Sequence, residues 1–297
     1  MSKKSKNRRP PSRRHQKSPF PIKVVLGVTA IIATLSAVTY YSVKDAGFVK
    51  ADANGCFPLD SGHTFALVDS SDPRFDAAQT RDLRTAFDQL YASEMAFNER
   101  FTIVTTEESR IGSIPAPAMV FCRSAHTGSE LAAVGAASAT PAYLAREAVS
   151  FFDQEFSPVM ADIFDPNPDD AQRQRRESPI MEQVQGVARQ ASFANSQGQR
   201  RLIIVSDMIQ STQEAQFCTK QGHLPSFETF KNSAYFDRVR PASLAGVEVE
   251  LYMLIRGGYG GTFLPYCSED ELRSFWTDYF VDAGASSVEI IRLRRGG

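Results

Sequence analysis

The stretch "FALVDSSDPRFD", from Phe65 to Asp76, is the basis of the fold prediction for this chain. A short apolar run ends abruptly in an acid, two serines and a second acid. The apolar part predicts a buried strand over 64–69. The polar part is either a turn stiffened by Pro73 or a group of oxygen ligands at the mouth of a sheet.

Segments that resemble this strand alternate with helical patterns along the rest of the chain. In 247–256 the apolar side chains alternate up to Met253, whereas the helical pattern of 141–164 is interrupted near Pro158. This order predicts an α/β fold, with a doubly wound, mostly parallel sheet that has helices on both faces. The predicted strands are 64–69, 100–106, 117–123, 200–208, 247–256 and 286–294, and the main helices are 76–97, 141–164, 180–195, 227–239 and 268–284.

Two of these strands end in an acid, Asp69 and Asp207. Ligands of open parallel sheets bind at the carboxyl ends of the strands. The two acids are therefore the strongest pointer to function in the chain. Ser178 stands just before the helix at 180–195, with Pro179 in its first turn, and is predicted to cap that helix.

The N-terminal region predicts a membrane anchor. Residues 1–23 hold nine lysines and arginines and no acid, which predicts a disordered cytoplasmic tail. Residues 24–43 contain no charge and are long enough to span a bilayer as a retained signal anchor. After a linker at 44–60, a domain at 61–297 is expected on the far side of a bacterial inner membrane, in the periplasm.

The charge of the folded region limits its partners, and the predicted topology determines how its cysteines are interpreted. Without residues 1–23 the chain has 24 basic residues against 34 acidic ones, so its body is acidic and a nucleic-acid partner is excluded for it. The four cysteines form no C-x-x-C pair, and in an oxidising compartment they predict disulfides. Three pairings are possible. We prefer Cys218 with Cys267, which leaves Cys56 with Cys122; a buried free thiol is the alternative.

The pattern of strands and acids resembles a von Willebrand factor A domain over residues 60–295. Members of that family bind a metal through a D-x-S-x-S motif after the first strand, a threonine at the start of a central helix and an aspartate after the fourth strand. Asp69 and Ser71 match the start of the motif, Ser178 stands near the position of the threonine, and Asp207 matches the late aspartate. Pro73 replaces the last serine of the motif, so the site lacks one ligand.

The resemblance implies a Mg²⁺ ion held by Asp69, Ser71, Ser178 and Asp207, and a partner protein that binds at this edge. The structural alternative is that Asp69 and Ser71 cap the helix that follows. Because the chain lacks a nucleophile with a base nearby, we expect a membrane-anchored protein-binding module of a bacterial envelope assembly rather than an enzyme. The alternative function is a metal-assisted hydrolase that uses Asp69 and Asp207.

Overall fold

The structure is a computed structural model that describes residues 47–69, 75–106, 116–164, 177–219, 223–255 and 266–293. The predicted tail at 1–23 and the predicted span at 24–43 lie outside these ranges. Within them, no helix combines the length and the apolar character that crossing a membrane requires. Residues Val49–Gly297 form one compact unit, whose first residue lies inside the stretch predicted as a linker, 44–60.

The described residues form a six-stranded mixed sheet in the order β3-β2-β1-β4-β5-β6. All neighbouring strands are parallel except β2 and β3, which are antiparallel. The prediction of a mostly parallel sheet is therefore confirmed. The strands are β1 (His63–Val68), β2 (Arg100–Thr105), β3 (Met119–Cys122), β4 (Arg200–Ser206), β5 (Val247–Leu254) and β6 (Ser287–Leu293).

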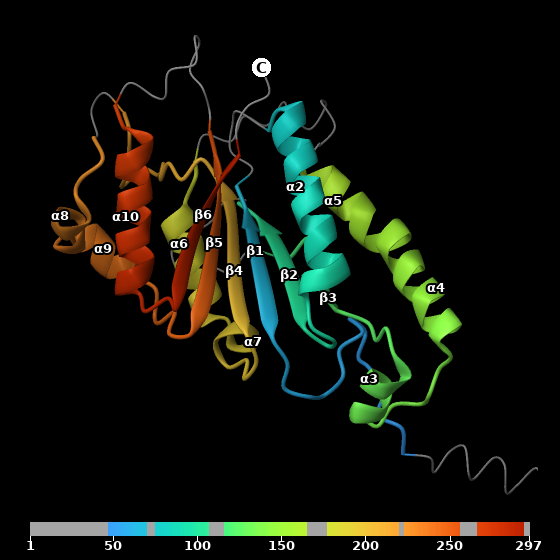
Figure 1. The fold of residues 1–297 in the computed structure, drawn as a ribbon. Coiled ribbons are helices and arrows are strands. Elements are labelled where there is room, and N and C mark those ends of the chain that lie inside the picture. The colour runs from blue at the N-terminus through green and yellow to red at the C-terminus, as the bar shows by residue number, and fades with distance from the viewer. Residues whose placement is uncertain are drawn as a thin grey trace, which may run out of the picture. The chain divides into compact units, whose positions relative to one another are not determined.

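Strands β1 and β4 occupy the centre of the sheet (Figure 1). Every residue of β1 is buried, and so are the last five residues of β4. Parallel strands covered on both faces have continuous apolar sequences, because neither face meets water. This is why "FALV" and "LIIV" show no alternation, whereas β5 alternates between buried and half-buried residues.

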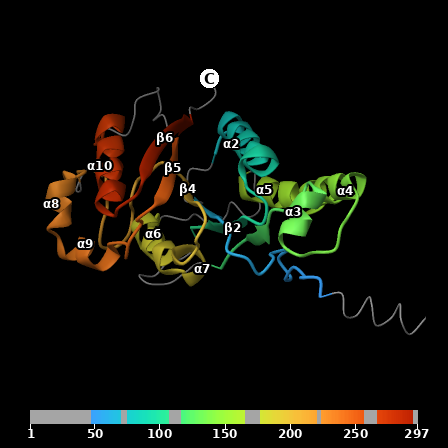
Figure 2. The ribbon, with the colours of Figure 1, turned by 60° about the horizontal axis from the view of Figure 1, so that its bottom comes forward.

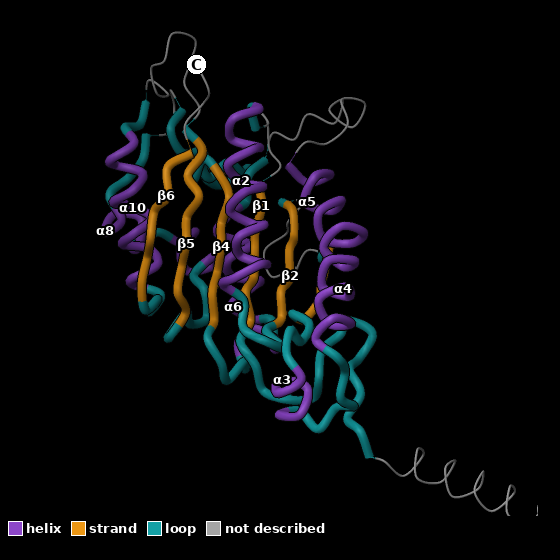
Figure 3. Tube along the Cα trace, turned by 45° about the vertical axis from the view of Figure 1, so that its right-hand side comes forward, coloured by secondary structure: helices purple, strands orange, loops and turns teal. Residues whose placement is uncertain are grey.

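Helices cover both faces of the sheet, with α2, α4 and α5 on one side and α6, α7 and α9 on the other (Figure 2). In Figure 3, α2 lies across the middle of the sheet, where Leu83 and Phe87 join the core of that face. On the opposite face, Trp276 and Phe280 of α10 are fully buried. The α-helices are α2 (Ala77–Gln89), α3 (Gly128–Ala133), α4 (Pro141–Phe151), α5 (Ser157–Phe164), α6 (Ile180–Arg189), α7 (Ala191–Ala194), α8 (Phe227–Lys231), α9 (Ala234–Val239) and α10 (Glu269–Asp282).

Asp76 begins helix α2. Its Oδ1 accepts hydrogen bonds from the backbone N–H groups of Ala78 and Gln79, both at 2.9 Å, and the Gln79 side chain completes a capping box. The alternative in which Asp69 caps this helix is therefore wrong, and Ser71 lies outside the described residues. The helix predicted over 76–97 leaves α-geometry at Leu90, where the π-helical turn η1 (Leu90–Glu94) begins.

The predicted interruption near Pro158 takes the form of a π-helical turn, η2 (Phe152–Phe156), between α4 and α5. Pro158 is the second residue of α5, and a proline inside a helix removes one backbone donor. The wider turn before it changes the hydrogen-bond register, so the helix passes the proline without ending. The helix predicted over 180–195 breaks at Gln190, whose extended ψ of 117° separates α6 from α7.

Two disulfides tie the loops to the sheet. Cys56 bonds to Cys122 at the end of β3, and Cys218, in the loop after β4, bonds to Cys267 just before α10. These are the pairs preferred from the sequence. The first disulfide lies at the edge of the sheet where the parallel strands begin, which we call the amino edge. The second fastens a loop at the opposite, carboxyl edge.

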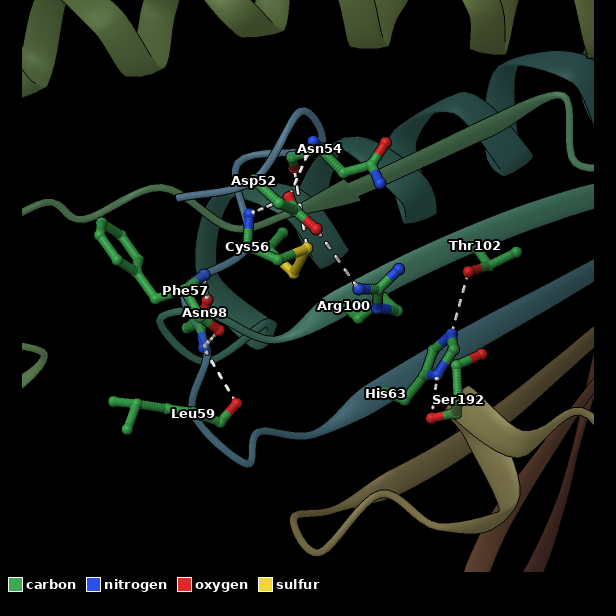
Figure 4. The surroundings of a disulfide bond; sticks show 11 residues. Asp52, Asn54, Cys56, Phe57, Leu59, His63, Asn98, Arg100, Thr102 and Ser192 are labelled. Carbon is green, nitrogen blue, oxygen red and sulfur yellow. Dashed lines mark hydrogen bonds and ion pairs between the residues drawn. A yellow bond between two sulfur atoms is a disulfide. The ribbon is translucent and has the colours of Figure 1, made fainter. Parts of the chain in front are cut away.

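The amino edge is held by local polar contacts around the first disulfide (Figure 4). The Asp52 Oδ1 atom accepts from the N–H of Cys56 at 2.9 Å. Asn98 adopts a positive φ of 61°, and its Oδ1 accepts from the N–H of Phe57 at 2.8 Å. Asparagine tolerates the left-handed region better than other residues with a side chain, because its short amide bonds to nearby backbone.

His63, the first residue of β1, is buried at the same edge. Its Nδ1 lies 3.0 Å from the carbonyl oxygen of Ser192, and its Nε2 lies 2.9 Å from Oγ1 of Thr102. Burial lowers the pKa of the imidazole to about 4, helped by the charge of Arg100 and opposed by the bond to Ser192. The ring is therefore neutral at pH 7 and joins β1, β2 and α7 without a charge.

Candidate functional site

Asp69 stands directly after β1 and is almost fully buried, with 2% of its surface exposed. Its N–H donates to the carbonyl oxygen of Val205 in β4 at 2.8 Å. On the other side, the N–H of Thr106 donates to the carbonyl oxygen of Val68 at 2.9 Å. The parallel register thus places the ends of β2, β1 and β4 side by side, with the Asp69 carboxylate between them.

Three hydroxyl groups donate to this carboxylate. The Oγ1 of Thr106 donates to Oδ1 at 3.0 Å, while the Oγ atoms of Ser178 and Ser206 donate to Oδ2 at 2.7 and 2.8 Å. Hydrogen bonds to an ionised acceptor are stronger than those between neutral groups. Asp69 therefore fastens three strand ends to the segment that leads into α6. We call these four residues the Asp69 cluster.

Ser178 differs from its predicted role as a helix cap. The cap residue of α6 is Pro179, which makes no side-chain capping bond, and the N–H of Met181 in the first turn donates to Oε1 of Gln210 instead. The Ser178 hydroxyl instead turns toward Asp69, and its backbone pairs with Ser211 through two hydrogen bonds of 2.7 and 3.0 Å. The prediction was wrong because the contact with Asp69 spans 109 residues and has no local signature.

Asp207 follows Ser206 at the end of β4 and is 8% exposed. Its Oδ1 accepts from the N–H of Ile209 at 3.0 Å, which closes a turn through Met208, whose φ is 63°. The structure therefore joins Asp69 to Ser178 directly, whereas the hydrogen bond described for Asp207 is to its own turn. Ser71 lies outside the described residues.

The loop that follows β4 is fixed by a buried polar network. The Nε2 of Gln210 donates at 2.8 Å both to Glu182 and to the hydroxyl of Tyr235, while its Oε1 accepts from the N–H of Met181 at 3.1 Å. The Tyr235 hydroxyl donates to Glu182 at 2.6 Å. Burial, together with the charge of Glu182, raises the pKa of Tyr235 well above its usual value. The tyrosine thus stays a neutral donor.

Two further contacts hold the same loop against α10. The indole Nε1 of Trp276 donates to the carbonyl oxygen of Met208 at 2.7 Å, and the Cys218–Cys267 disulfide closes the far end. With Ser211 bound to Ser178, the loop is held at several points between Met208 and Cys218. At the carboxyl edge, the segment from Met208 to Cys218 therefore offers a surface whose backbone is held in place.

Sequence reasoning missed two members of the Asp69 cluster, Thr106 and Ser206. Both stand at the end of a strand, so the rule that selected the acids could have selected these hydroxyls. The network of Glu182, Gln210 and Tyr235 had no such signal, because its members come from a helix, a loop and another helix.

The Asp69 cluster consists of oxygen atoms only, which is the donor type that Mg²⁺ prefers. A hydroxyl that donates to Asp69 keeps lone pairs that can face a cation, so the residues present fit such an ion chemically. In the ranges that the structure describes, no three residues of the types His, Cys, Asp and Glu come together as a metal site. A metal role for Asp69, Ser71, Ser178 and Asp207 stays a prediction, as does the hydrolase alternative.

Comparison with known proteins gives a limited result. No protein-family model matches the chain, and no curated protein matches its sequence. One similar solved structure is the human COPII-coat protein Sec24c, with 11% identity and a TM-score of 0.40. The match covers 82% of this chain and 31% of that chain, and at this level it assigns neither family nor function. The mixed, mostly parallel sheet is compatible with a von Willebrand factor A-like fold.

Proposed function

We propose that this chain is a membrane-anchored, extracytoplasmic protein-binding module of a bacterial envelope assembly, with a von Willebrand factor A-like domain that binds its partner at the carboxyl edge. The observation that carries the proposal is the Asp69 cluster, a buried carboxylate that orders the strand ends at the edge where open parallel sheets bind ligands. Two disulfides support a location in an oxidising compartment.

The loop after β4 supplies the contact surface in this proposal. Gln213, Glu214 and Gln216 are exposed on it, while the backbone beneath them is held by the contacts of Gln210 and Ser211. A surface that is ordered before binding loses little conformational entropy on association. Polar, exposed side chains on a rigid loop therefore suit a specific protein contact.

Site-specific photo-crosslinking in membranes tests this surface. A photoreactive residue replaces Gln216 at the carboxyl edge, and the matched control replaces Gln197, an exposed glutamine at the amino edge between α7 and β4. We expect a discrete adduct with one protein from position 216 and none from position 197. Adducts of equal yield at both positions, or none at 216, would contradict the proposed contact surface.

The metal is a separate part of the proposal. We propose that Mg²⁺ binds at Asp69, Ser71, Ser178 and Asp207, where it would bridge to an acidic side chain of the partner. Calorimetric titration of the full chain with MgCl₂ tests this, with Asp207→Asn as the variant and Asp237→Asn, an exposed acid of α9, as its control. Heat that is lost only in Asp207→Asn supports the site. Identical titrations of all three proteins would contradict the proposed Mg²⁺ site. The crosslinking result would be unaffected.

The anchor at 24–43 and the orientation also belong to the proposal. Reporter enzymes that are active only in the periplasm or only in the cytoplasm, fused after Gly297, test the orientation. We expect activity of the periplasmic reporter and silence of the cytoplasmic one, and the reverse pattern would place the domain in the cytoplasm.

A further inference from the structure

The strand pair β5–β6 has one face covered by α10 and one face that differs from it sharply. Toward α10, Val247, Val249, Leu251 and Met253 are buried in the core. On the other face the last residues, Leu254 and Leu293, are buried, whereas the side chains before them are half-buried or exposed, although the strands are parallel. We call this second face the acidic face, and its residues are Glu248, Glu250, Tyr252, Glu289 and Ile291.

The first turn of α2 reaches the carboxyl end of β5 and β6, where Gln79 donates to the carbonyl oxygens of Ile255 and Leu293. Over the five residues of the acidic face, no helix in the described ranges is seen (Figure 3). Figure 3 shows β5 and β6 open to the viewer, next to α2, which covers the neighbouring strands. Parallel strands are almost always covered on both faces, because their side chains are buried on both. Tyr252 and Ile291, which face each other in the register, give the acidic face an apolar centre.

The charges on this face are mostly of one sign. Arg201 bonds to Glu94 at 2.9 Å and to Glu250 at 3.2 Å. Of the ion pairs between described residues, none involves Glu248 or Glu289, although Glu248 accepts a hydrogen bond from Gln199 at 2.7 Å. One arginine therefore stands against four carboxylates.

This arrangement has an electrostatic cost within the folded chain. Glu250 and Glu289 lie directly opposite each other in the register, and like charges in that position are destabilising. Burial raises the pKa of the Glu250 carboxyl; Arg201 opposes this, and Glu94 and Glu289 raise it further. A cationic ligand over the face would remove the repulsion.

We propose that the acidic face binds a basic, amphipathic helix of a partner protein, laid across β5 and β6 as a covering helix. The apolar stripe of that helix would pack on Tyr252 and Ile291, while its lysines and arginines would pair with Glu248, Glu250 and Glu289. A second copy of this chain does not suit the face, because two-fold pairing would place acids against acids. The acidic face is distinct from the carboxyl edge, so this proposal is independent of the proposed function.

A synthetic peptide tests the proposal. The probe is a labelled helix of about five turns, with leucines on one face and lysines on the other, and its matched control carries glutamates in place of the lysines. Fluorescence anisotropy with the full chain measures the dissociation constant. We expect the basic peptide to bind and the acidic peptide not to bind.

Variants locate the contact. The double variant Glu250→Gln/Glu289→Gln should weaken binding of the basic peptide by about tenfold, because two charge pairs are lost while the shape is kept. The control Glu228→Gln/Asp237→Asn removes the same charge from exposed positions on α8 and α9 and should change the dissociation constant by less than about twofold. Equal weakening in both would show a diffuse effect of net charge and overturn the proposal.

The substitution Ile291→Ser distinguishes a helix that packs on the acidic face from a contact made by charges alone. It leaves the charge unchanged and should weaken binding several-fold through the lost apolar contact. Unchanged affinity of this variant would overturn the proposal. So would self-association of the full chain that the Glu250→Gln/Glu289→Gln variant alters, because it would assign the face to a second copy.

Discussion

The two edges of the sheet join their strand ends through different kinds of buried side chain. At the amino edge a buried imidazole, His63, joins β1 to β2 and α7, and its lowered pKa keeps it neutral. At the carboxyl edge a buried carboxylate, Asp69, joins β1 to β2, β4 and the segment before α6 through three hydroxyl donors. The amino edge also holds a buried acid, Glu99, but that carboxylate accepts from Thr64 of β1 and from the N–H of Ala96 next to its own strand, whereas the hydroxyls on Asp69 come from three separate segments.

This difference indicates that the carboxyl edge has a function beyond folding. A neutral side chain can join strand ends, as His63 does. A buried carboxylate costs more, because its lost hydration must be replaced by hydrogen bonds from the protein. At the carboxyl edge this arrangement coincides with an ordered loop and with the edge where parallel sheets bind ligands. We therefore expect the two edges to respond differently to perturbation.

The largest effect is expected from removing either disulfide. The bridges close loops of 66 and 49 residues, so the chain-entropy model gives nearly the same loss for each, about 4 kcal/mol. The test is denaturant unfolding of the full chain with Cys56→Ser/Cys122→Ser or Cys218→Ser/Cys267→Ser. A larger loss for the second pair would show that this disulfide also supports the folded loop at the carboxyl edge. Loss from neither pair would contradict the pairing.

The next effect concerns Asp69. Replacement by asparagine keeps the shape but turns one acceptor oxygen into a donor that faces the hydroxyls of the cluster. We expect a loss of about 3 kcal/mol, since buried groups lose their partner and the charged acceptor is gone. The control Asp162→Asn, at an exposed position of α5, should change the free energy of unfolding by less than about 0.5 kcal/mol. Equal small losses would mean that Asp69 orders nothing.

The sequence predicted Asp69 and its place after a buried strand, because both are local features of "FALVD". It could not predict the partners of Asp69. Thr106, Ser178 and Ser206 reach it only because β2 and β4 flank β1, and strand order is set by the packing of the whole sheet. The π-helical turns were missed for a related reason: their geometry depends on the packing of rings such as Tyr91 and Phe156, which stack at 5.0 Å.

The acidic face shows a further limit. The alternation of Val247, Val249, Leu251 and Met253 was visible in the sequence and predicts a strand with two unlike faces. Which face has a covering helix depends on where α2 and α10 pack. That choice is made by long-range contacts, so the pattern alone could not identify an open face.

His63 at the amino edge predicts that the free energy of unfolding depends on pH. Because the folded-state pKa of His63 is about 4 and the unfolded value is 6.5, the unfolded chain binds more protons between these values. Stability from this group is therefore complete above pH 6.5 and falls as the pH falls. Between pH 7.5 and pH 5 the loss should be about 2 kcal/mol.

The variant His63→Gln isolates this effect. It removes the titrating group and should flatten the pH dependence of the free energy of unfolding by the same amount, while His126 and the acids still titrate in both proteins. Parallel curves for the wild type and His63→Gln would show that the imidazole has the same pKa in the folded and the unfolded chain. The contrast between the neutral His63 at the amino edge and Asp69 at the carboxyl edge would then fail.

The smallest effect compares two acids of the same stretch, Asp69 and Asp76. Asp76 is only half-buried, and its task is to cap α2 through the N–H groups of Ala78 and Gln79. A serine at this position can make the same bonds, so Asp76→Ser should be nearly neutral, whereas Asp76→Ala should cost about 1 kcal/mol in the free energy of unfolding. At Asp69 a serine is too short to reach three hydroxyls at once, and Asp69→Ser should be as damaging as Asp69→Asn. If serine leaves the free energy of unfolding unchanged at both positions, the two acids have the same role. Asp69 is then an ordinary turn residue.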